Sequence, residues 1–565
     1  MKQQQLLQIT GLCIITFLVG LFCVPLMDID ATQYASMSRE MLLHGNYLQL
    51  YDLGDDYLDK PPMLFWLSSL SLRIFGIHDW AYRLPSFLFS LLAVYSTYRL
   101  ALLFYKRDIA VLSAAVLASC QAMFLINHDV RTDTMLMGWV TCSIWQLAEW
   151  YQYNKWKNIL LAAITIAGGM MTKGPLALMI PVFAFVPHFI LRRNWKDFAR
   201  WQYLPMLLVI AILLIPMSIG LYQQYDLQPG KIVVDKKIAS GLKFFYWDQS
   251  FGRITGGSQQ QAENNSIFFL LQNMLWSFLP WILFFLIALF AAIKSIIKKR
   301  FLLTNKEECI TLAGFTVTYL ALGSSKAQLP HYIFVVLPLA AIITANFLYN
   351  LSNSAEWQKW RRPLFAIHTL LFFLMWVVLI LLISIPFKSI PVYVPVLAGL
   401  CFVAFMWLAF SKSVAFPKLS GICFFTSIGL NVFLNTAFYP ALLQFQTGNI
   451  AAKFINQNQL PKQNVFIYGD VVTARKSLYF YGNYFFKKVT DANTLTTGSY
   501  VLTSQKDYAE LLKKKPAAII FTGKGFNVTK LTFKFINPAT REGELQQFYI
   551  ADEVVFVYRF RLHIF

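Results

Sequence analysis

Acidic residues and paired cysteines are scarce in this 565-residue sequence. Only 14% of the residues are charged, and 49 Lys and Arg stand against 28 Asp and Glu, which gives a net charge of +21 at pH 7. The 7 cysteines are scattered singly, no CxxC pair occurs, and the chain after residue 438 has none. This spacing argues against a disulfide framework and a thiolate metal site. Cysteines in or beside apolar runs are instead expected to be small buried side chains.

Long apolar runs dominate the sequence, of which 57% is hydrophobic. A bilayer core of ~30 Å is crossed by about 20 apolar residues in a helix, and runs of roughly that length recur along the chain. The pattern predicts an α-helical polytopic membrane protein with about 13 transmembrane helices. We place them near residues 6–26, 84–104, 109–126, 134–150, 158–172, 175–191, 203–221, 267–293, 309–323, 330–349, 364–385, 391–410 and 415–437.

The basic residues gather in short clusters between these runs, which is typical of cytoplasmic loops and not of a nucleic-acid surface. With the N-terminus inside, every predicted inside loop is basic, including residues 192–200. The first run is followed by VPLMDID, which has no small-x-small cleavage site, so we interpret it as an uncleaved span. An odd number of spans places the C-terminal segment outside, and a miscount by one would place it inside.

The composition changes near residue 439, where short polar and β-rich segments replace the long runs. NVFIYG, SYVLTS, AAIIFTG, KLTFKFI and EVVFVYRF are typical of strands, and residues 449–457 and 506–514 of helices. We therefore predict a transmembrane domain at residues 1–438, with outside loops at 27–83 and 222–266, and a soluble α/β domain at 439–565. The second outside loop contains several glycines and an aromatic patch, which fits either a lid or a simple interfacial loop.

The first outside loop carries an unusual density of charge, and charges beside a bilayer are rare unless they are used. Residues 31–45 have the spacing of an amphipathic helix that lies along the membrane surface, with Arg39 and Glu40 away from its apolar face. The helix begins at Asp30, where the helix dipole favours an anion or the phosphate of a ligand. An N-cap role for Asp30 is compatible with this.

Cations and a second acid occur in segments that face the same side under this topology. Lys60 in DKPP can reach a lipid phosphate, although a snorkelling lysine is the commoner role. Asp133 in NHDVRTD lies at the start of a predicted span. Its simplest role is to pair with Arg131 or to cap the helix of that span. Lys173 in TKGP and the tyrosine of LPHY complete the set. Such a set suits a reaction that releases a lipid-linked phosphate, because cations stabilise the developing charge and an acid activates or orients the acceptor.

The motifs DIDATQYASMSREML, DKPP, RLPS, RTD, TKGP and LPHY, in this order before a soluble tail, resemble those of bacterial lipid-linked sugar transferases of the GT-C fold. These are the aminoarabinose transferases that modify lipid A and the related protein O-mannosyltransferases. The resemblance implies an integral membrane glycosyltransferase of the bacterial inner membrane, with its active site and soluble domain facing the periplasm. It implies transfer of a sugar from a polyprenyl phosphate carrier to a lipid A or protein acceptor, with inversion.

The resemblance also suggests roles for individual residues. The candidate catalytic acids are Asp30 and Asp133, and the candidate contacts of the carrier phosphate or substrate are Lys60, Lys173, Tyr332, His331 and Arg253. The chain departs from the family pattern at Ala31, where Glu is common, and at Gln33, where a basic residue is common. These departures leave the acceptor open.

No cofactor is firmly implied, although a divalent metal is possible, with Asp59 the position to watch. The histidines of the outside loops show no recognised ligand spacing. The expected partners are the lipid-linked sugar, the acceptor and membrane lipids, with no nucleic acid. Two alternatives remain at this point: a transporter or flippase of lipid-linked glycans, and a non-catalytic envelope scaffold. A transporter typically places its coupling acids near the middle of the membrane, and this sequence has few acids there.

Overall fold

The computed structural model describes residues 3–228, 230–233, 236–249, 266–304, 307–325, 328–354, 357–411, 415–469 and 472–552. The chain divides into two compact units. Unit 1 comprises residues 1–24, 40–380 and 396–436, and unit 2 comprises residues 25–39, 381–395 and 437–565. The start of the first outside loop therefore belongs to the same unit as the C-terminal segment.

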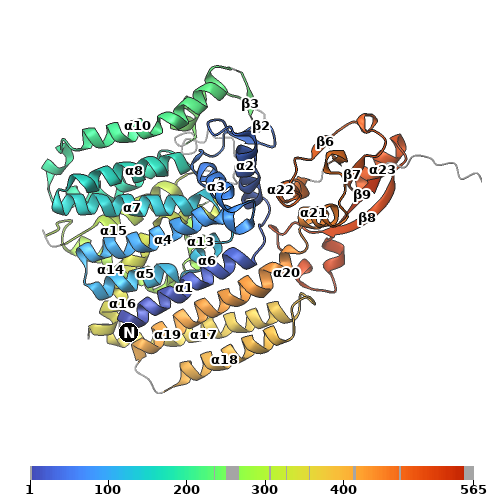
Figure 1. Ribbon diagram of the computed structural model, residues 1–565. Helices are drawn as coiled ribbons and strands as arrows, with labels where there is room; N and C mark the ends of the chain where they lie inside the picture. Colours follow the sequence, from blue (N-terminus) through green and yellow to red (C-terminus); the bar gives the residue numbers. More distant parts are fainter. Residues whose placement is uncertain are drawn as a thin grey trace, which may run out of the picture. The chain divides into compact units, whose positions relative to one another are not determined.

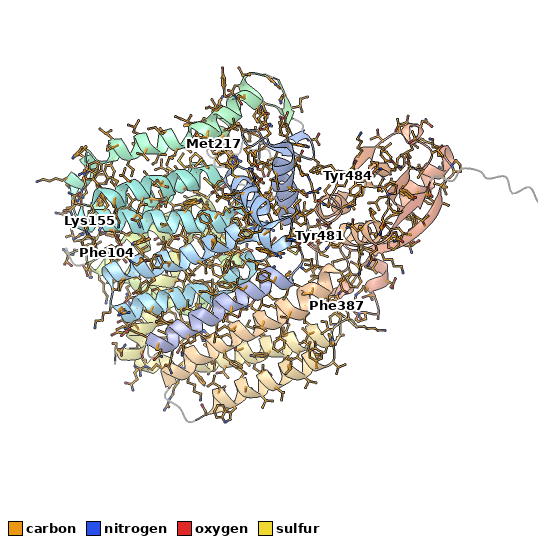
Figure 2. All side chains as sticks on the ribbon, viewed as in Figure 1. Phe104, Lys155, Met217, Phe387, Tyr481 and Tyr484 are labelled. Atoms are coloured by element: carbon orange, nitrogen blue, oxygen red, sulfur yellow. The ribbon has the colours of Figure 1, made fainter. Side chains whose placement is uncertain are left out.

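Unit 1 is built from helices that lie side by side (Figure 1). Their bounds are α1 Gln3–Cys23, α3 Met63–Phe75, α4 Asp79–Phe104, α5 Arg107–Ala118, α6 Gln121–Ile126, α7 Thr132–Tyr153, α8 Trp156–Lys173, α9 Leu176–Leu191, α10 Tyr203–Leu221, α13 Phe269–Ser277, α14 Ile282–Lys298, α15 Ile310–Gly323, α16 Leu337–Asn353, α17 Gln358–Ser384, α18 Tyr393–Phe410 and α19 Ala415–Phe433. The last turn of α17 and the first of α18 fall in unit 2. Phe104, at the end of α4, and Lys155, between α7 and α8, lie at the same end of the bundle (Figure 2).

Every predicted span falls mostly on helix, and the span at residues 330–349 begins as the 3-10 helix η4, Pro330–Val336, before α16. Seven helices within the described residues are long and apolar enough to cross a membrane, and three shorter apolar helices accompany them. The chain is therefore a multi-pass α-helical membrane protein with a strand-containing C-terminal region. The count of about 13 spans stays a prediction.

Two predicted spans are each broken into two helices. Residues 109–126 form α5 and α6, and residues 267–293 form α13 and α14. Pro280 has no N–H to continue a helix, and the two breaks meet, because Gln121 N donates to Leu279 O at 2.9 Å. The indole of Trp281 also donates to Ser119 Oγ at 2.9 Å. These contacts satisfy polar groups that the broken helices would leave exposed to lipid.

Arg83, from the RLPS motif, fastens α4 to neighbouring segments of unit 1. Its side chain is fully buried, and its guanidinium donates to the carbonyls of His128, Leu21 and Val24 at 3.0, 3.0 and 2.6 Å. The fixed, always charged guanidinium can satisfy several carbonyls at once. The arginine of the RLPS motif therefore has a structural role, because it binds carbonyl groups at the C-terminal end of α1.

Unit 2 contains a five-stranded sheet in the order β6-β5-β7-β9-β8. Its strands are β5 Val465–Tyr468, β6 Lys487–Val489, β7 Tyr500–Ser504, β8 Ala518–Gly525 and β9 Gln546–Asp552. Strands β6, β5 and β7 are parallel, whereas β9 pairs antiparallel with β7 and β8. The helices are α20 Tyr439–Leu443, α21 Thr447–Gln457, α22 Val472–Tyr481, α23 Gln505–Lys514 and α24 Phe533–Ile536. The predicted α/β composition is confirmed.

Some of the predicted strands differ from the structure. NVFIYG, SYVLTS and AAIIFTG contain β5, β7 and β8. KLTFKFI was expected to be a strand, but it forms the short helix α24, because the Thr532 hydroxyl caps the helix by accepting a hydrogen bond from Phe535 N. Strands β6 and β9 were not predicted. EVVFVYRF, at residues 553–560, lies outside the described residues.

Candidate functional site

Asp30 begins helix α2, Asp30–His44, as predicted, and belongs to unit 2. The residues just before it are held by the C-terminal part of that unit. Leu26 N donates to the Tyr481 hydroxyl at 2.7 Å, and Asp28 N donates to Gln446 Oε1 at 2.9 Å. The Gln446 amide in turn donates to Leu26 O at 3.0 Å. Unit 2 therefore fixes the backbone that leads into Asp30.

Asp28 adds a side-chain contact to this attachment. Its carboxylate is buried and accepts hydrogen bonds from the hydroxyls of Thr32 at 2.6 Å and Ser477 at 2.8 Å. Burial raises the pKa of Asp28 to about 6, although both hydroxyls and nearby Lys476 act to lower it. Asp28 therefore links the start of α2 to helix α22 within unit 2. The sequence pattern around Asp28 predicts no such role.

The position of α2 along the membrane surface stays a prediction, but the expectation that Arg39 and Glu40 lie on a polar face is wrong. Both side chains are buried. Within unit 2, Arg39 donates to Tyr479 O at 2.6 Å and its guanidinium lies 5.0 Å from the centre of the Phe485 ring. Burial lowers the pKa of Arg39 to about 10. Nearly every residue from Ala31 to Met41 is buried, so the helix was predicted correctly but its polar face was not.

Within unit 1, Glu40 organises the next part of the first loop. Its two carboxylate oxygens accept hydrogen bonds from Leu53 N at 2.7 Å and Gly54 N at 2.8 Å. These two residues form the turn of a hairpin between β1, Tyr51–Asp52, and β2, Asp55–Asp56, and both have positive φ. Burial raises the pKa of Glu40, and the two backbone hydrogen bonds act to lower it. The carboxylate thus stabilises a turn conformation that costs energy at Leu53.

Asp133, at the first turn of α7, is the centre of a charged cluster in unit 1. Its carboxylate is 2% exposed and forms an ion pair with the Lys173 ammonium at the end of α8. His331, in the 3-10 helix η4 Pro330–Val336, places Nε2 3.5 Å from the other carboxylate oxygen. The Lys173 ammonium also lies 4.0 Å from the centre of the Tyr332 ring. Four predicted site residues from three distant motifs therefore meet.

Lys60 contributes positive charge to this cluster, because its field acts on the ionisation of both Asp133 and His331. Its ammonium is paired with Asp59 at 2.7 Å, and its side chain is 11% exposed. Lys60 also borders a small apolar cavity of about 20 Å³, with Pro61, Pro62 and Met217 among the other lining residues. Lys60 therefore lies beside an apolar wall within unit 1.

The second outside loop holds the hairpin in place. Gln224, in the π-helix η2 Tyr222–Asp226, accepts from Leu50 N at 3.0 Å and donates to Asp56 at 2.8 Å. Lys231 pairs with the same carboxylate at 2.9 Å. Asp56 is therefore a structural anchor, and the choice between a lid and an interfacial loop stays open. Arg253 lies outside the described residues.

The described residues contain no group of three or more His, Cys, Asp or Glu side chains that could hold a metal ion. Asp59, the predicted position to watch, is paired with Lys60. Among the described residues, Asp59 and its neighbours do not form a metal-ligand set.

Sequence comparison supports the motif-based resemblance. Residues 59–219 match the family described as dolichyl-phosphate-mannose-protein mannosyltransferase. The undecaprenyl phosphate-alpha-4-amino-4-deoxy-L-arabinose arabinosyl transferase of Erwinia tasmaniensis is 28% identical over 336 residues, which is 58% of this chain and 57% of the relative. Its counterpart numbered 2 in Proteus mirabilis is 29% identical over 343 residues, or 59% and 57% of the two chains. The match thus spans somewhat more than half the length of these relatives.

The solved structure of ArnT from Cupriavidus metallidurans bound to undecaprenyl phosphate superimposes with a TM-score of 0.75, at 16% identity, over 98% of this chain and 99% of that one. The chain resembles the bacterial aminoarabinose transferases. This confirms the predicted resemblance and the GT-C type of fold. Of the predicted site residues, Lys60, Asp133 and Lys173 fall inside the segment that matches the mannosyltransferase family, whereas Asp30 precedes it.

Proposed function

We propose that this protein is an integral membrane glycosyltransferase that moves a sugar from a polyprenyl phosphate carrier to lipid A. The observation that carries the proposal is the meeting of Lys173, Tyr332, His331 and Asp133, within the field of Lys60, in a chain with the fold of ArnT. The relatives are named as transferases of aminoarabinose from undecaprenyl phosphate, which supports a lipid-linked donor. Lipid A as the acceptor rests on the family resemblance.

The proposed reaction is a single displacement at the anomeric carbon of the sugar. An acceptor oxygen forms the new bond to this carbon as the bond from carbon to the carrier phosphate oxygen breaks. The leaving polyprenyl phosphate keeps the electron pair, and Lys60 and Lys173 stabilise its charge. Asp133 holds the Lys173 ammonium in place. Attack opposite to the leaving group gives inversion, and a phosphate leaving group needs no strong general acid, unlike that of a glycosidase.

Asp30 is the proposed acid on the acceptor side. A lipid A phosphate is already ionised near neutral pH, so with this acceptor Asp30 acts by orientation. With a protein hydroxyl, Asp30 takes the proton as a general base. Within unit 2, the hydrogen bonds of Leu26 and Asp28 hold the backbone that leads into Asp30.

The test uses the purified full chain in reconstituted membranes with an undecaprenyl phosphate-linked aminoarabinose donor and lipid A. The wild type is expected to form the glycosylated product, and Asp30→Asn to lose at least about 100-fold in rate while still binding carrier. Lys60→Ala is expected to weaken carrier binding. Full transfer by Asp30→Asn would remove Asp30 from the proposal, and unchanged carrier affinity would reduce Lys60 to a snorkelling residue.

Movement of the lipid-linked sugar across the membrane without a new glycosidic bond would favour the transporter alternative. We further propose that the cluster and unit 2 face the periplasm, as the distribution of basic loops predicts.

A further inference from the structure

A half-open apolar groove lies among α7, α8, α9 and α10, away from the proposed catalytic cluster. Its volume is about 310 Å³, at the lower end of the range of ligand pockets. Apolar side chains of all four helices line it, including Ile166, Phe185 and Met206. Val182 and Leu207, also in the lining, are 40% and 46% exposed, so the groove opens to the outside of the bundle. In a membrane, this opening faces hydrocarbon, and an apolar cavity of this kind takes apolar occupants.

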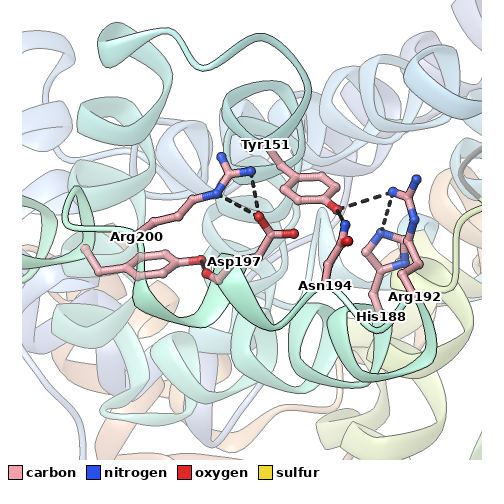
Figure 3. A network of polar contacts seen from close by, with 7 residues as sticks. Tyr151, His188, Arg192, Asn194, Asp197 and Arg200 are labelled. Carbon is pink, nitrogen blue, oxygen red and sulfur yellow. Dashed lines mark hydrogen bonds and ion pairs between the residues drawn. The ribbon is translucent and has the colours of Figure 1, made fainter.

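A network of polar contacts joins residues of α7, α9 and the segment between α9 and α10 (Figure 3). Arg200 donates through Nε and Nη2 to Asp197 at 2.9 and 2.7 Å, and the Tyr203 hydroxyl donates to Asp197 O at 3.0 Å. The Arg200 guanidinium also lies 4.9 Å from the centre of the Trp150 ring. Tyr203 and Trp150 are themselves part of the groove lining. The network therefore fixes the segment between α9 and α10 directly at the end of the groove.

The segment between α9 and α10 is positively charged, as a binding site for an anionic lipid headgroup requires. Residues 192–200 contain four basic residues and one acid, Asp197, which is buried and paired with Arg200. Arg193 and Lys196 are exposed, so their charges are available to a ligand. Exposed basic residues beside the ends of transmembrane helices attract anionic lipid headgroups.

Exposed aromatic side chains lie at this same end of the groove, which indicates that it is near the membrane–water interface. Trp195 and Trp201 are each 63% exposed, and Trp201 contacts the Trp156 ring at a centroid distance of 5.1 Å. Exposed Trp beside Lys and Arg is characteristic of the membrane–water interface. Trp156 begins helix α8, whose other end is Lys173. An 18-residue helix is about 25 Å long, so the groove end and the catalytic cluster lie at opposite ends of α8.

We propose that this groove binds one anionic phospholipid of the bilayer, with an acyl chain between α9 and α10 and its phosphate on Arg193 and Lys196. The apolar lining of the groove would contact the acyl chain, and the exposed Arg193 and Lys196 would offset the negative charge of the headgroup. Under the predicted topology this is the cytoplasmic leaflet. The site is independent of the proposed sugar transfer, since none of its residues belongs to the catalytic cluster.

Native mass spectrometry of the detergent-purified full chain, titrated with phosphatidylglycerol or phosphatidylcholine, tests this site. One phosphatidylglycerol is expected to bind at least about 10-fold more tightly than phosphatidylcholine. Leu207→Trp fills the groove and is expected to abolish the preference. Leu208→Trp is the matched control, because Leu208 is the adjacent residue on α10, is 61% exposed and does not line the groove.

The headgroup contact is tested separately by Arg193→Asn combined with Lys196→Gln. Arg193 has a φ of 54°, a conformation that Asn tolerates better than Ala, so this change removes charge without adding backbone strain. Loss of two phosphate-facing charges is expected to weaken phosphatidylglycerol binding about 30-fold and to weaken phosphatidylcholine binding much less, because choline offsets the charge of its phosphate.

Three results would overturn the proposal: equal binding of the two lipids, equal effects of Leu207→Trp and Leu208→Trp, or displacement of phosphatidylglycerol by a lower concentration of undecaprenyl phosphate. The last result would identify the groove as a carrier site. Thermal unfolding of each variant in lipid-free detergent checks that binding is lost without loss of folding.

Discussion

Asp28→Asn is expected to remove a pH dependence from the stability of unit 2. The Asp28 carboxyl is buried against Thr32 and Ser477, and its pKa is raised by burial from 3.8 to about 6. Because the folded pKa lies above the unfolded one, folding favours the protonated acid. The stabilisation is fully present below about pH 4 and is lost as the pH rises through about 6. A shift of roughly two units corresponds to about 3 kcal/mol, of which about 2 kcal/mol falls between pH 4.5 and 7.5.

The assay is thermal unfolding of the full chain in detergent at pH 4.5 and pH 7.5, with limited proteolysis of the C-terminal segment as the signal. Other groups titrate in this range, so the measured quantity is the difference between wild type and Asp28→Asn. Glu510→Gln is the control, because Glu510 is an exposed acid on α23 of the same unit. It is expected to leave the pH response of the wild type unchanged.

A second variant separates titration of Asp28 from a general loss of folding. Ser477→Ala removes a hydrogen bond that favours the ionised carboxylate, so the pKa of Asp28 is expected to rise further. The pH dependence of stability should then increase. Equal pH responses of wild type, Asp28→Asn and Ser477→Ala would refute the reasoning.

Three further predictions concern unit 1 and the topology. Lys173→Met leaves the Asp133 carboxylate buried without its ion-pair partner, so thermal unfolding in detergent should show a loss of about 3–5 kcal/mol, and adding Asp133→Leu should restore much of it. An unrecovered double variant would contradict the pairing. Arg83→Met leaves three carbonyls without their donor and should cost about 3–5 kcal/mol, whereas Arg73→Met, at an exposed position, should change little. A reporter fused after Phe565 should be labelled from outside intact cells, and labelling only from the cytoplasm would refute the predicted orientation.

The sequence predicted the membrane helices because a span leaves a direct pattern, about 20 apolar residues in succession. It also predicted the start of α2 at Asp30. The breaks at Ser119 and Pro280 were missed, because the apolar runs on either side were counted as single spans, although Pro280 is itself a helix breaker. That the two breaks meet, through the hydrogen bond from Gln121 N to Leu279 O, is visible only in the structure. The helix at Phe533–Ile536 was missed because its segment has the composition of a strand, and only the Thr532 hydroxyl caps it as a helix.

The sequence by itself determined which chemistry the chain carries, since acids and cations in Asp-, Lys- and His-containing motifs are visible without a structure. Only the tertiary structure decided which of them meet. Asp133, Lys173 and His331 lie far apart in the chain and come together because three helix ends converge. Asp28 and Ser477 are 449 residues apart, and nothing local to either predicts their hydrogen bond. Burial and pairing are properties of packing, and so the roles of Arg39, Arg83 and Asp28 could be assigned only from the structure.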